Sequence, residues 1–404
     1  MNILFHHRTR GRGAEGVHIR GVVKGLRELG HKVSILSLPG ADPEEEEKPQ
    51  QSSEAKQPES SKVASKESAT TNPLRWLTDL TKHVPEFAFE LFELAYNLVA
   101  WFRVRKTVSA LDIQMIYERY SLFMFATVWW CKRHNIPIVL EINDSALVDR
   151  VRSLYFRKFA CRIERWIFSN ATGLVFISSH FQQVATDAYG EITSSVVSPN
   201  AADLDKFVLN DADAQALRVE LGIDDKVVLG YVGAFVYWHG IDWFVEMIAD
   251  RLKEVPNLVL LLVGDGVCYE SIRNRVSQAG VESQVILPGR VEHTDVARYL
   301  SAMDFGILPD SNDYGSPMKL FEFMAMAKGM VAPDFSPIAE VVEDGKTSWL
   351  FKANDRKACI DKVLQLIDDR QELKQVGGFA REYIERERQW RHNAEQIISL
   401  VSHG

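Results

Sequence analysis

Apolar strands alternate with amphipathic helices from the first residues of this chain, and a glycine-containing loop joins the first pair. Residues 2–5 are a short apolar run, residues 17–29 repeat apolar side chains at helical spacing up to Gly30, and residues 32–38 are a second apolar run. Strand, glycine loop, helix and strand in this order open a doubly wound parallel sheet. Ligands of such sheets bind at the carboxyl ends of the strands.

The same alternation starts again in the second half of the chain. Residues 227–232 form an apolar run, residues 241–252 have helical periodicity, and residues 258–263 are uniformly apolar. A length of 404 residues is enough for two or three domains with substantial cores. We therefore predict an α/β protein with two Rossmann-like, doubly wound domains in tandem.

Residues 40–73 interrupt this pattern. They are rich in Glu, Lys, Ser, Gln and Pro and contain almost no large apolar side chain, a composition that cannot bury a core. We predict a disordered surface insertion there. It is either a tolerated loop, which we favour, or a segment that binds a partner or regulates the site.

Charge and cysteine content narrow the function classes. The formal net charge of -8 argues against a nucleic-acid partner, because phosphate neutralisation needs a clustered basic surface. The four cysteines are scattered and favour buried thiols in a reducing compartment. The amino terminus lacks a secretory pattern, and no uncharged apolar run reaches the roughly 18 residues that a spanning helix needs. We expect a cytoplasmic protein.

Residues 315–329 predict a turn that opens a helix with charges on its first turns. Gly315 lets the backbone approach a ligand, and Pro317 suits a first helical position. The free N–H groups there and the Lys319 ammonium favour an anion such as phosphate. Glu322 lies three residues after Lys319, so both groups lie on one helix face. The alternative is a capped helix with a surface ion pair.

This segment resembles the donor-binding signature of family-4-type glycosyltransferases of the GT-B fold, approximately Ser-Pro-x-Lys-x-x-Glu. Four further segments fit the family in the same order, at residues 13–18, 198–203, 263–266 and 338–345. The resemblance covers nearly the whole chain. It implies two Rossmann-like domains facing a cleft, retention of anomeric configuration, and no bound metal or cofactor apart from a nucleotide sugar as co-substrate.

The resemblance also implies domain boundaries and donor contacts. It places an acceptor-side domain at residues 1–205, a nucleotide-sugar domain at 206–385, and a helix at 386–404 that returns to the first domain. Glu322 is expected to accept hydrogen bonds from the ribose hydroxyls, and Lys319 to pair with the diphosphate. The expected cradle around them consists of Gly315, Ser316, Pro317, Met318 and Leu320.

Two departures from the family pattern concern the donor side. Tyr314 stands where relatives have an acid near the donor sugar. The loop that begins at Gly233 has lost the usual arginine and lysine, and only His239 remains, either as a phosphate donor when protonated or as an uncharged loop residue. Because these two cations are missing, phosphate binding should depend more on Lys319. Gly264 belongs to another matching loop, at residues 263–266.

On the first domain, the loop with Gly13 and Gly16 resembles the family's glycine turn, whose amides approach the diphosphate; a plain strand-to-helix turn is the alternative. His18 is either a site residue or a packed helix residue. Asn143 and Asp144 follow an apolar strand, where relatives place a sugar-contacting histidine. One or the other is expected to face the transferred sugar, or else the two residues cap a helix.

Residues 85–106 are strongly apolar, with acids on the early turns and a basic end. Their aromatic side chains suit either a bilayer surface, where a lipid-linked acceptor would be reached, or a core helix, which we favour. Basic residues of a following segment add either a lipid-facing or a solvated face; they are Arg150, Arg152, Arg157, Lys158, Arg162 and Arg165.

The leading functional hypothesis is transfer of a sugar from a nucleoside diphosphate to a glycan or lipid-linked acceptor, in the assembly of a cell-surface polysaccharide. A nucleotide-sugar 2-epimerase shares the fold and is the first alternative. The second is a catalytically silent nucleotide-sugar-binding protein, suggested by Tyr314 and the missing loop cations.

Overall fold

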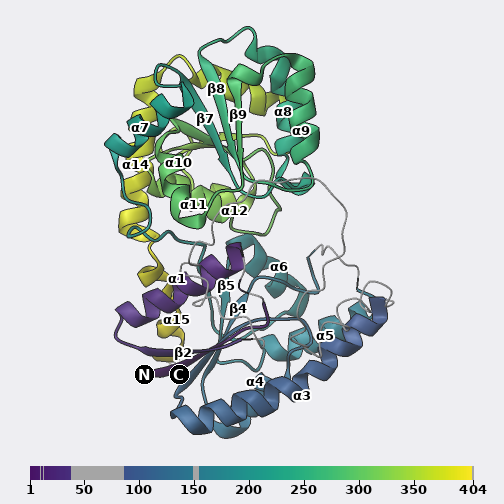
Figure 1. Ribbon diagram of the computed structural model, residues 1–404. Helices are drawn as coiled ribbons and strands as arrows, with labels where there is room; N and C mark the ends of the chain where they lie inside the picture. The colour runs from purple at the N-terminus through teal and green to yellow at the C-terminus, as the bar shows by residue number, and fades with distance from the viewer. Residues whose placement is uncertain (10, 12, 38–85, 149–153, 403–404) are drawn as a thin grey trace, which may run out of the picture.

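The computed structural model describes residues 1–9, 11, 13–37, 86–148 and 154–402. The predicted insertion at residues 40–73 lies outside them. The chain forms two α/β halves, one above the other in Figure 1, and the two termini lie together on the lower half.

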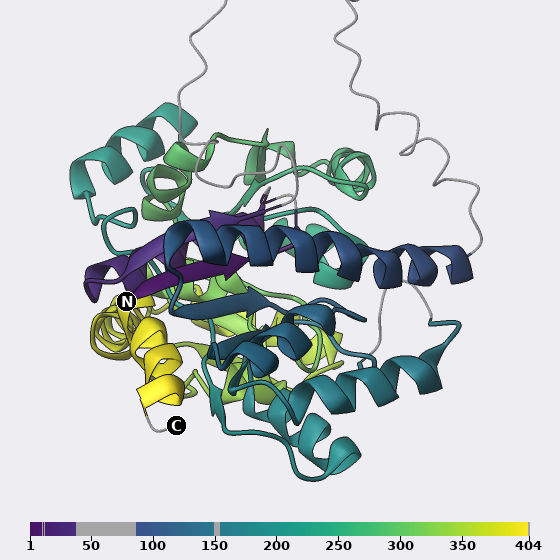
Figure 2. The same ribbon diagram turned by 90° about the horizontal axis from the view of Figure 1, so that it is seen from below.

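The first half is a parallel sheet in the order β2-β1-β3-β4-β5-β6. Its strands are β1 (Asn2–His6), β2 (Lys32–Leu36), β3 (Met115–Arg119), β4 (Ile138–Ile142), β5 (Gly173–Phe176) and β6 (Ser195–Val197). Its helices are α1 (Ala14–Glu28), α3 (Glu86–Leu111), α4 (Ala126–His134), α5 (Arg157–Phe168) and α6 (Ser179–Tyr189). In Figure 2, α3 runs as one long helix across this half.

The second half repeats the arrangement in the order β12-β11-β10-β7-β8-β9, again all parallel. Its strands are β7 (Val227–Val232), β8 (Leu258–Val263), β9 (Val285–Gly289), β10 (Phe305–Ile307), β11 (Met330–Pro333) and β12 (Trp349–Phe351). Its helices are α7 (Asp211–Leu221), α8 (Ile241–Leu252), α9 (Tyr269–Ala279), α10 (Val296–Ser301), α11 (Met318–Ala325), α12 (Ser336–Ala339), α13 (Arg356–Leu366) and α14 (Arg370–Glu387).

Each sheet has a point at which the strand order reverses, and the reversal fixes where a ligand binds. In the first sheet it lies between β1 and β3, and in the second between β7 and β10. At such a point, the connections that follow two neighbouring strands run in opposite directions, and a crevice opens between them at the carboxyl ends of the strands. The predicted fold of two doubly wound Rossmann-like domains is confirmed.

The last helix, α15 (Trp390–Ser402), returns to the first half and packs on α1, which confirms the predicted crossing. Two glycines of α1 permit this close approach. A Cβ atom on Gly21 would lie 2.2 Å from the Trp390 ring, and one on Gly25 would lie 2.2 Å from the Trp390 carbonyl oxygen. Trp390 is 3% exposed, so it is a core residue of the first half.

We expect Gly21→Ala to destabilise the protein by about 1–3 kcal/mol, because the added methyl group overpacks the contact with Trp390. Gly378→Ala in α14 is the matched control, since no atom of the described chain lies within 4 Å of its added Cβ. That control should gain up to about 1 kcal/mol from helix propensity. Urea denaturation measures both; equal effects would contradict the packing account.

None of the helices in the described part of the chain is both long and apolar enough to cross a membrane.

Candidate functional site

The turn before α11 and the loop after β7 meet at the reversal point of the second sheet. α11 follows β10, and Gly233 follows β7, the strand that pairs with β10. In Figure 1, α11 and α12 lie at the lower edge of the upper half, next to α1 and α6 of the other. The predicted anion-binding helix therefore opens toward the boundary between the halves.

Lys319, on the first turn of α11, is held by an aromatic residue of β7. Its Nζ donates to the Tyr231 hydroxyl at 3.0 Å and lies 4.4 Å from the centre of the Tyr231 ring. Burial lowers the pKa of Lys319 to about 7, although Glu322 acts in the opposite direction. The ammonium is therefore poorly solvated and would gain much from an anion.

Glu322 lies one turn further along α11 and is also poorly solvated. Burial raises its pKa to about 7, and the Lys319 charge opposes the rise. Among the described residues, no donor hydrogen-bonds its carboxylate, and Lys319 does not approach closely enough for an ion pair. The alternative of a surface ion pair is therefore wrong, because both side chains are half-buried and the two groups form no ion pair.

His239 and two glycines complete this part of the site. His239 Nδ1 lies 2.9 Å from the Ala234 carbonyl oxygen and 3.1 Å from the Tyr231 hydroxyl. Burial, and then the Lys319 charge, lower the pKa of His239 to about 4, so its ring is neutral at pH 7. A Cβ on Gly233 would lie 3.3 Å from Lys319 Nζ, and one on Gly264 would lie 1.9 Å from the Gly233 carbonyl oxygen.

The turn before α11 has fewer free backbone N–H groups than the sequence predicts. The Leu320 N–H donates to the Pro317 carbonyl at 3.1 Å, and the Gly315 N–H donates to Asn312 Oδ1 at 2.5 Å. Pro317 has no N–H. In the described structure, the N–H groups of Ser316, Met318 and Lys319 keep no acceptor, so these three amides remain for a ligand.

Alternate residues of the same turn contact the first half. The Tyr314 ring packs edge-on against Phe181, with ring centres 5.4 Å apart, and its carbonyl accepts a bond from Ser178. Ser316 Oγ accepts the Asn200 N–H at 3.0 Å. Met318 packs against the core cluster that contains Trp390. Tyr314, which replaces the usual acid, is therefore part of the contact between the two halves.

In the first half, His18 and Asn143 converge on Glu141, a residue that the sequence reading did not single out. The buried Glu141 carboxylate also accepts bonds from Arg119 and, at 2.9 Å, from Tyr117. Burial alone would raise the pKa of Glu141, but His18, Arg119 and the hydrogen bonds together hold it below its ordinary value. The sequence did contain one signal for Glu141, because a charged residue inside an apolar strand needs a buried partner.

His18 itself is both packed and polar. Its ring meets Trp390 edge-on with centres 5.0 Å apart, and its Nδ1 lies 3.4 Å from Glu141 Oε2. Burial lowers the pKa of His18 to about 4, so the ring is neutral at pH 7. Asp144 accepts the Ser145 N–H at 2.8 Å in a turn, and no helix starts among residues 145–148. The helix-cap alternative for Asn143 and Asp144 is therefore wrong.

The glycine turn takes the conformation that its residues favour. Gly13 has φ of 97°, and its carbonyl accepts the N–H groups of Gly16 and Val17 at the start of α1. A Cβ on Gly16 would lie 2.0 Å from the Gly11 carbonyl oxygen, so only glycine fits there. The turn follows β1, at the reversal point of the first sheet.

A cavity of about 600 Å³ lies between the halves, beside the turn. Val17 and Lys24 of α1, Met318 of α11, Trp390 and the linker residue Asp203 are among its lining residues. Lys319, Glu322 and His18 do not line it. The site is therefore defined by its charged side chains and free amides, and the cavity adjoins it through Met318.

Among the described residues, no group of three or more His, Cys, Asp or Glu side chains is arranged to hold a metal ion.

Two doubly wound halves that face each other, with the last helix tying them together, are the GT-B fold. Residues 15–206 match the family model described as Glycosyltransferase Family 4, and residues 226–369 match the one described as Glycosyl transferases group 1. The chain therefore belongs to the family-4-type glycosyltransferases, and the resemblance drawn from its motifs is confirmed.

Individual relatives are distant in sequence. The chain is 23% identical over 244 residues to alpha-D-kanosaminyltransferase of Streptomyces kanamyceticus, covering 58% of this chain and 62% of that protein. It is 24% identical over 245 residues to the GDP-mannose-dependent alpha-(1-6)-phosphatidylinositol monomannoside mannosyltransferase of Mycolicibacterium smegmatis, covering 59% and 64%. The matches thus span less than two thirds of these relatives.

Solved structures share the whole fold. The Anabaena protein HepE superposes with a TM-score of 0.71 at 15% identity, and all of both chains is covered. Sucrose-phosphate synthase of Thermosynechococcus elongatus superposes with a TM-score of 0.70 at 16% identity, covering 100% of this chain and 99% of that one.

Proposed function

We propose that this protein transfers a sugar from a nucleoside diphosphate to an acceptor, with the donor held on α11. The observation that carries the proposal is the pair of half-buried, poorly solvated groups, Lys319 and Glu322, beside three free amides. An ammonium and amides stabilise a diphosphate, and a carboxylate accepts the two hydroxyls of a ribose. No neutral ligand would use all of these groups.

The donor class is supported by the relatives. HepE is described in complex with UDP and with UDP-glucose, and the mycobacterial relative is named as GDP-mannose-dependent. These ligands share a nucleoside diphosphate and differ in base and sugar. We therefore assign the donor as a nucleoside diphosphate sugar.

In the proposed reaction, the charge that grows on the departing diphosphate is stabilised by this chain's own groups. Lys319 Nζ and the amides of Ser316, Met318 and Lys319 face that charge, together with the dipole of α11. These groups would take the place of a resident metal, and the family resemblance implies retention at the anomeric carbon. Gly13 and Gly16 close the diphosphate site from the first half, and Asn143 contacts the transferred sugar, with Glu141 fixing its orientation.

The acceptor is a glycan or a lipid-linked glycan of the cell surface. The mycobacterial relative, whose name specifies a phosphatidylinositol monomannoside, supports this class. The protein acts in the cytoplasm, and the buried free thiols of Cys131, Cys268 and Cys359 suit a reducing compartment.

The test is a thermal-shift screen of UDP and GDP sugars, followed by an assay of nucleotide release and glycoside formation with lipid-linked and soluble acceptors. We expect a stabilising donor and acceptor-dependent release, unaffected by a chelator. If the assay instead yields the 2-epimer of the donor and no glycoside, the protein is an epimerase and not a transferase. Failure of every nucleotide sugar to bind would remove the proposal.

Donor binding should depend on pH in two opposite ways. Above pH 7 the Lys319 amine is largely neutral, so binding an anion takes up as much as about one proton, and affinity falls as pH rises. Below pH 7 Glu322 is largely protonated, so binding the ribose releases a proton, and affinity falls as pH falls. Affinity is therefore greatest near pH 7.

Calorimetry in buffers of different ionisation enthalpy measures these protons. A nucleotide sugar is the right probe, because its phosphates are diesters and lack the monoester ionisation near pH 6. His239 stays neutral at pH 8 because its pKa is about 4. Glu322→Gln should remove proton release at pH 6 and keep the uptake at pH 8. Proton exchange of zero at both pH values would contradict the assignment.

A further inference from the structure

The outer face of α3 is apolar and exposed over three turns. Leu91, Leu98 and Phe102 are 51%, 65% and 62% exposed, and their spacing places them on one side of the helix. The opposite side carries Tyr96, Asn97 and other residues that face the first half. The prediction of a core helix therefore holds for the inner face of α3, and it is wrong for the outer face.

Polar contacts on the inner side of α3 fix two neighbouring helices. The buried Glu90 carboxylate accepts the backbone N–H groups of Tyr155 and Phe156 at the start of α5. The buried Asn97 Oδ1 accepts the N–H groups of Phe125 and Ala126 at the start of α4. The three helices are thus held in a fixed relation, and their outer faces form one rigid surface.

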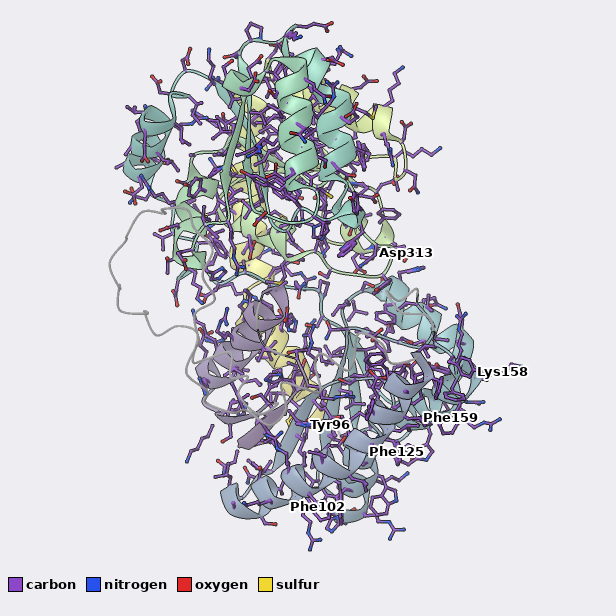
Figure 3. All side chains as sticks on the ribbon, turned by 45° about the vertical axis from the view of Figure 1, so that its right-hand side comes forward. Tyr96, Phe102, Phe125, Lys158, Phe159 and Asp313 are labelled. Atoms are coloured by element: carbon purple, nitrogen blue, oxygen red, sulfur yellow. The ribbon has the colours of Figure 1, made fainter. Side chains whose placement is uncertain are left out.

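The outer faces of α4 and α5 combine aromatic and basic side chains. Phe125 and Trp129 are exposed on α4, and Arg133 lies 4.8 Å from the centre of the Trp129 ring. On and just before α5, the exposed aromatic residues are Tyr155, Phe156, Phe159 and Trp166, and the exposed basic ones are Arg157, Lys158, Arg162 and Arg165. Figure 3 shows Phe102, Phe125, Phe159 and Lys158 along one side of the first half.

The charge of this surface has one sign. No carboxylate in the described part of the chain pairs with the four basic residues of α5, and Glu164, the acid of that helix, is buried with bonds from Tyr120, Tyr189 and Ser145. Arg105, Lys106, Lys132 and Arg133 add exposed cations on α3 and α4. The whole chain carries a formal charge of -8, so this basic face is a strong local exception.

We propose that the outer faces of α3, α4 and α5 dock on an anionic lipid bilayer surface. Exposed Leu, Phe and Trp side chains enter the boundary between headgroups and acyl chains, and the cations at their edges pair with anionic headgroups. A large apolar area rimmed by cations is costly in water and favourable there. Arg150 and Arg152 lie outside the described residues.

Two other occupants fit the surface less well. A second copy of this chain would bring cations of the same sign together across a two-fold contact. Residues 40–73 contain almost no large apolar side chain and so could not cover an apolar face. An anionic bilayer satisfies both the apolar and the charged part.

The surface is connected to the candidate site through the interior of α3. Arg8, which follows β1 and precedes the glycine turn, lies 4.4 Å from the centre of the Tyr96 ring of α3. A docked α3 would therefore hold the glycine turn close to the membrane, where a lipid-linked acceptor is found. This consequence rests on the proposed function, whereas the docking itself does not.

Vesicle sedimentation with the full-length protein tests the docking without donor or acceptor, so its failure is separate from failure of the proposed transfer. We expect binding to vesicles of phosphatidylcholine with phosphatidylglycerol, and much weaker binding to phosphatidylcholine alone. Binding to the anionic vesicles should weaken at high salt.

Two sets of variants locate the surface. Lys158→Ala, Arg162→Ala and Arg165→Ala together should weaken binding about 100-fold, at about fivefold for each cation near an anionic surface. Leu98→Ser with Phe102→Ser should also weaken it at least tenfold. The matched control is Lys253→Ala, Lys352→Ala and Lys374→Ala, three exposed lysines of the second half, which should leave binding unchanged. Circular dichroism confirms that each variant is folded.

Absence of wild-type binding to anionic vesicles would overturn the proposal. Equal loss in the control triple would do the same, because it would reduce the effect to net charge. Sedimentation equilibrium without lipid completes the test: a wild-type dimer that becomes a monomer on Leu98→Ser with Phe102→Ser would assign the surface to a second copy.

Discussion

Replacing Lys319 by Met should lower kcat/KM for sugar transfer by at least about 10³-fold, because the diphosphate then loses the side-chain cation on the first turn of α11. The loss should fall on donor binding and on kcat together, since the charge on the diphosphate grows in the transition state. Steady-state kinetics with the donor found in the screen measures both.

Glu322→Ala should cause a comparable loss, mainly in donor affinity, because the ribose hydroxyls lose their acceptor. The matched control is Lys328→Met, which removes another partly buried lysine just beyond the same helix. It should keep turnover within a few-fold of wild type. Full activity of Lys319→Met or Glu322→Ala would show that the donor lies elsewhere.

Glu141→Leu should destabilise the protein by about 3–5 kcal/mol, because it leaves the Arg119 guanidinium partly buried without its carboxylate. It also removes the acceptor of Tyr117 and the partner of Asn143. Chemical denaturation gives the free energy of unfolding. The exposed pair Glu343 and Lys346 provides the control, and Glu343→Leu should change stability by no more than about 0.5 kcal/mol.

A double variant separates charge from packing. Arg119→Leu with Glu141→Leu removes both charges, and it should recover a large part of the stability lost in Glu141→Leu alone. If the double variant is as unstable as the sum of the single ones, the Glu141 cluster owes its stability to shape and not to the ion pair. Glu141→Gln keeps an oxygen that can accept from Asn143 but lacks the charge opposite Arg119, so it should destabilise the protein less than Glu141→Leu does.

The sequence predicted the fold well because periodicity records burial. Residues 241–252 and 258–263 coincide with α8 and β8. The apolar side chains of α8 face one core, and those of β8 alternate between the cores on the two faces of the sheet. The start of α4 at Ala126 is less predictable, because Asn97 of α3 accepts the backbone N–H groups of Phe125 and Ala126 there. A capping residue that is distant in the sequence leaves no local signal.

The donor side of the site was predicted from its spacing, since Lys319 and Glu322 lie on one helix. Tyr231 was not, because an aromatic residue in an apolar strand is normally core, and its contact with Lys319 depends on the pairing of β7 with β10. Glu141 was missed for the same reason: its four partners come from β3, α1 and the loop after β4. Tertiary neighbours of this kind cannot be read from periodicity.

A crystal structure of the protein with a bound nucleoside diphosphate sugar tests the central claim most directly. We expect the diphosphate on Lys319 Nζ and on the amides of Ser316, Met318 and Lys319, with the ribose hydroxyls on the Glu322 carboxylate. A nucleotide bound elsewhere, with these groups out of contact with it, would contradict the account.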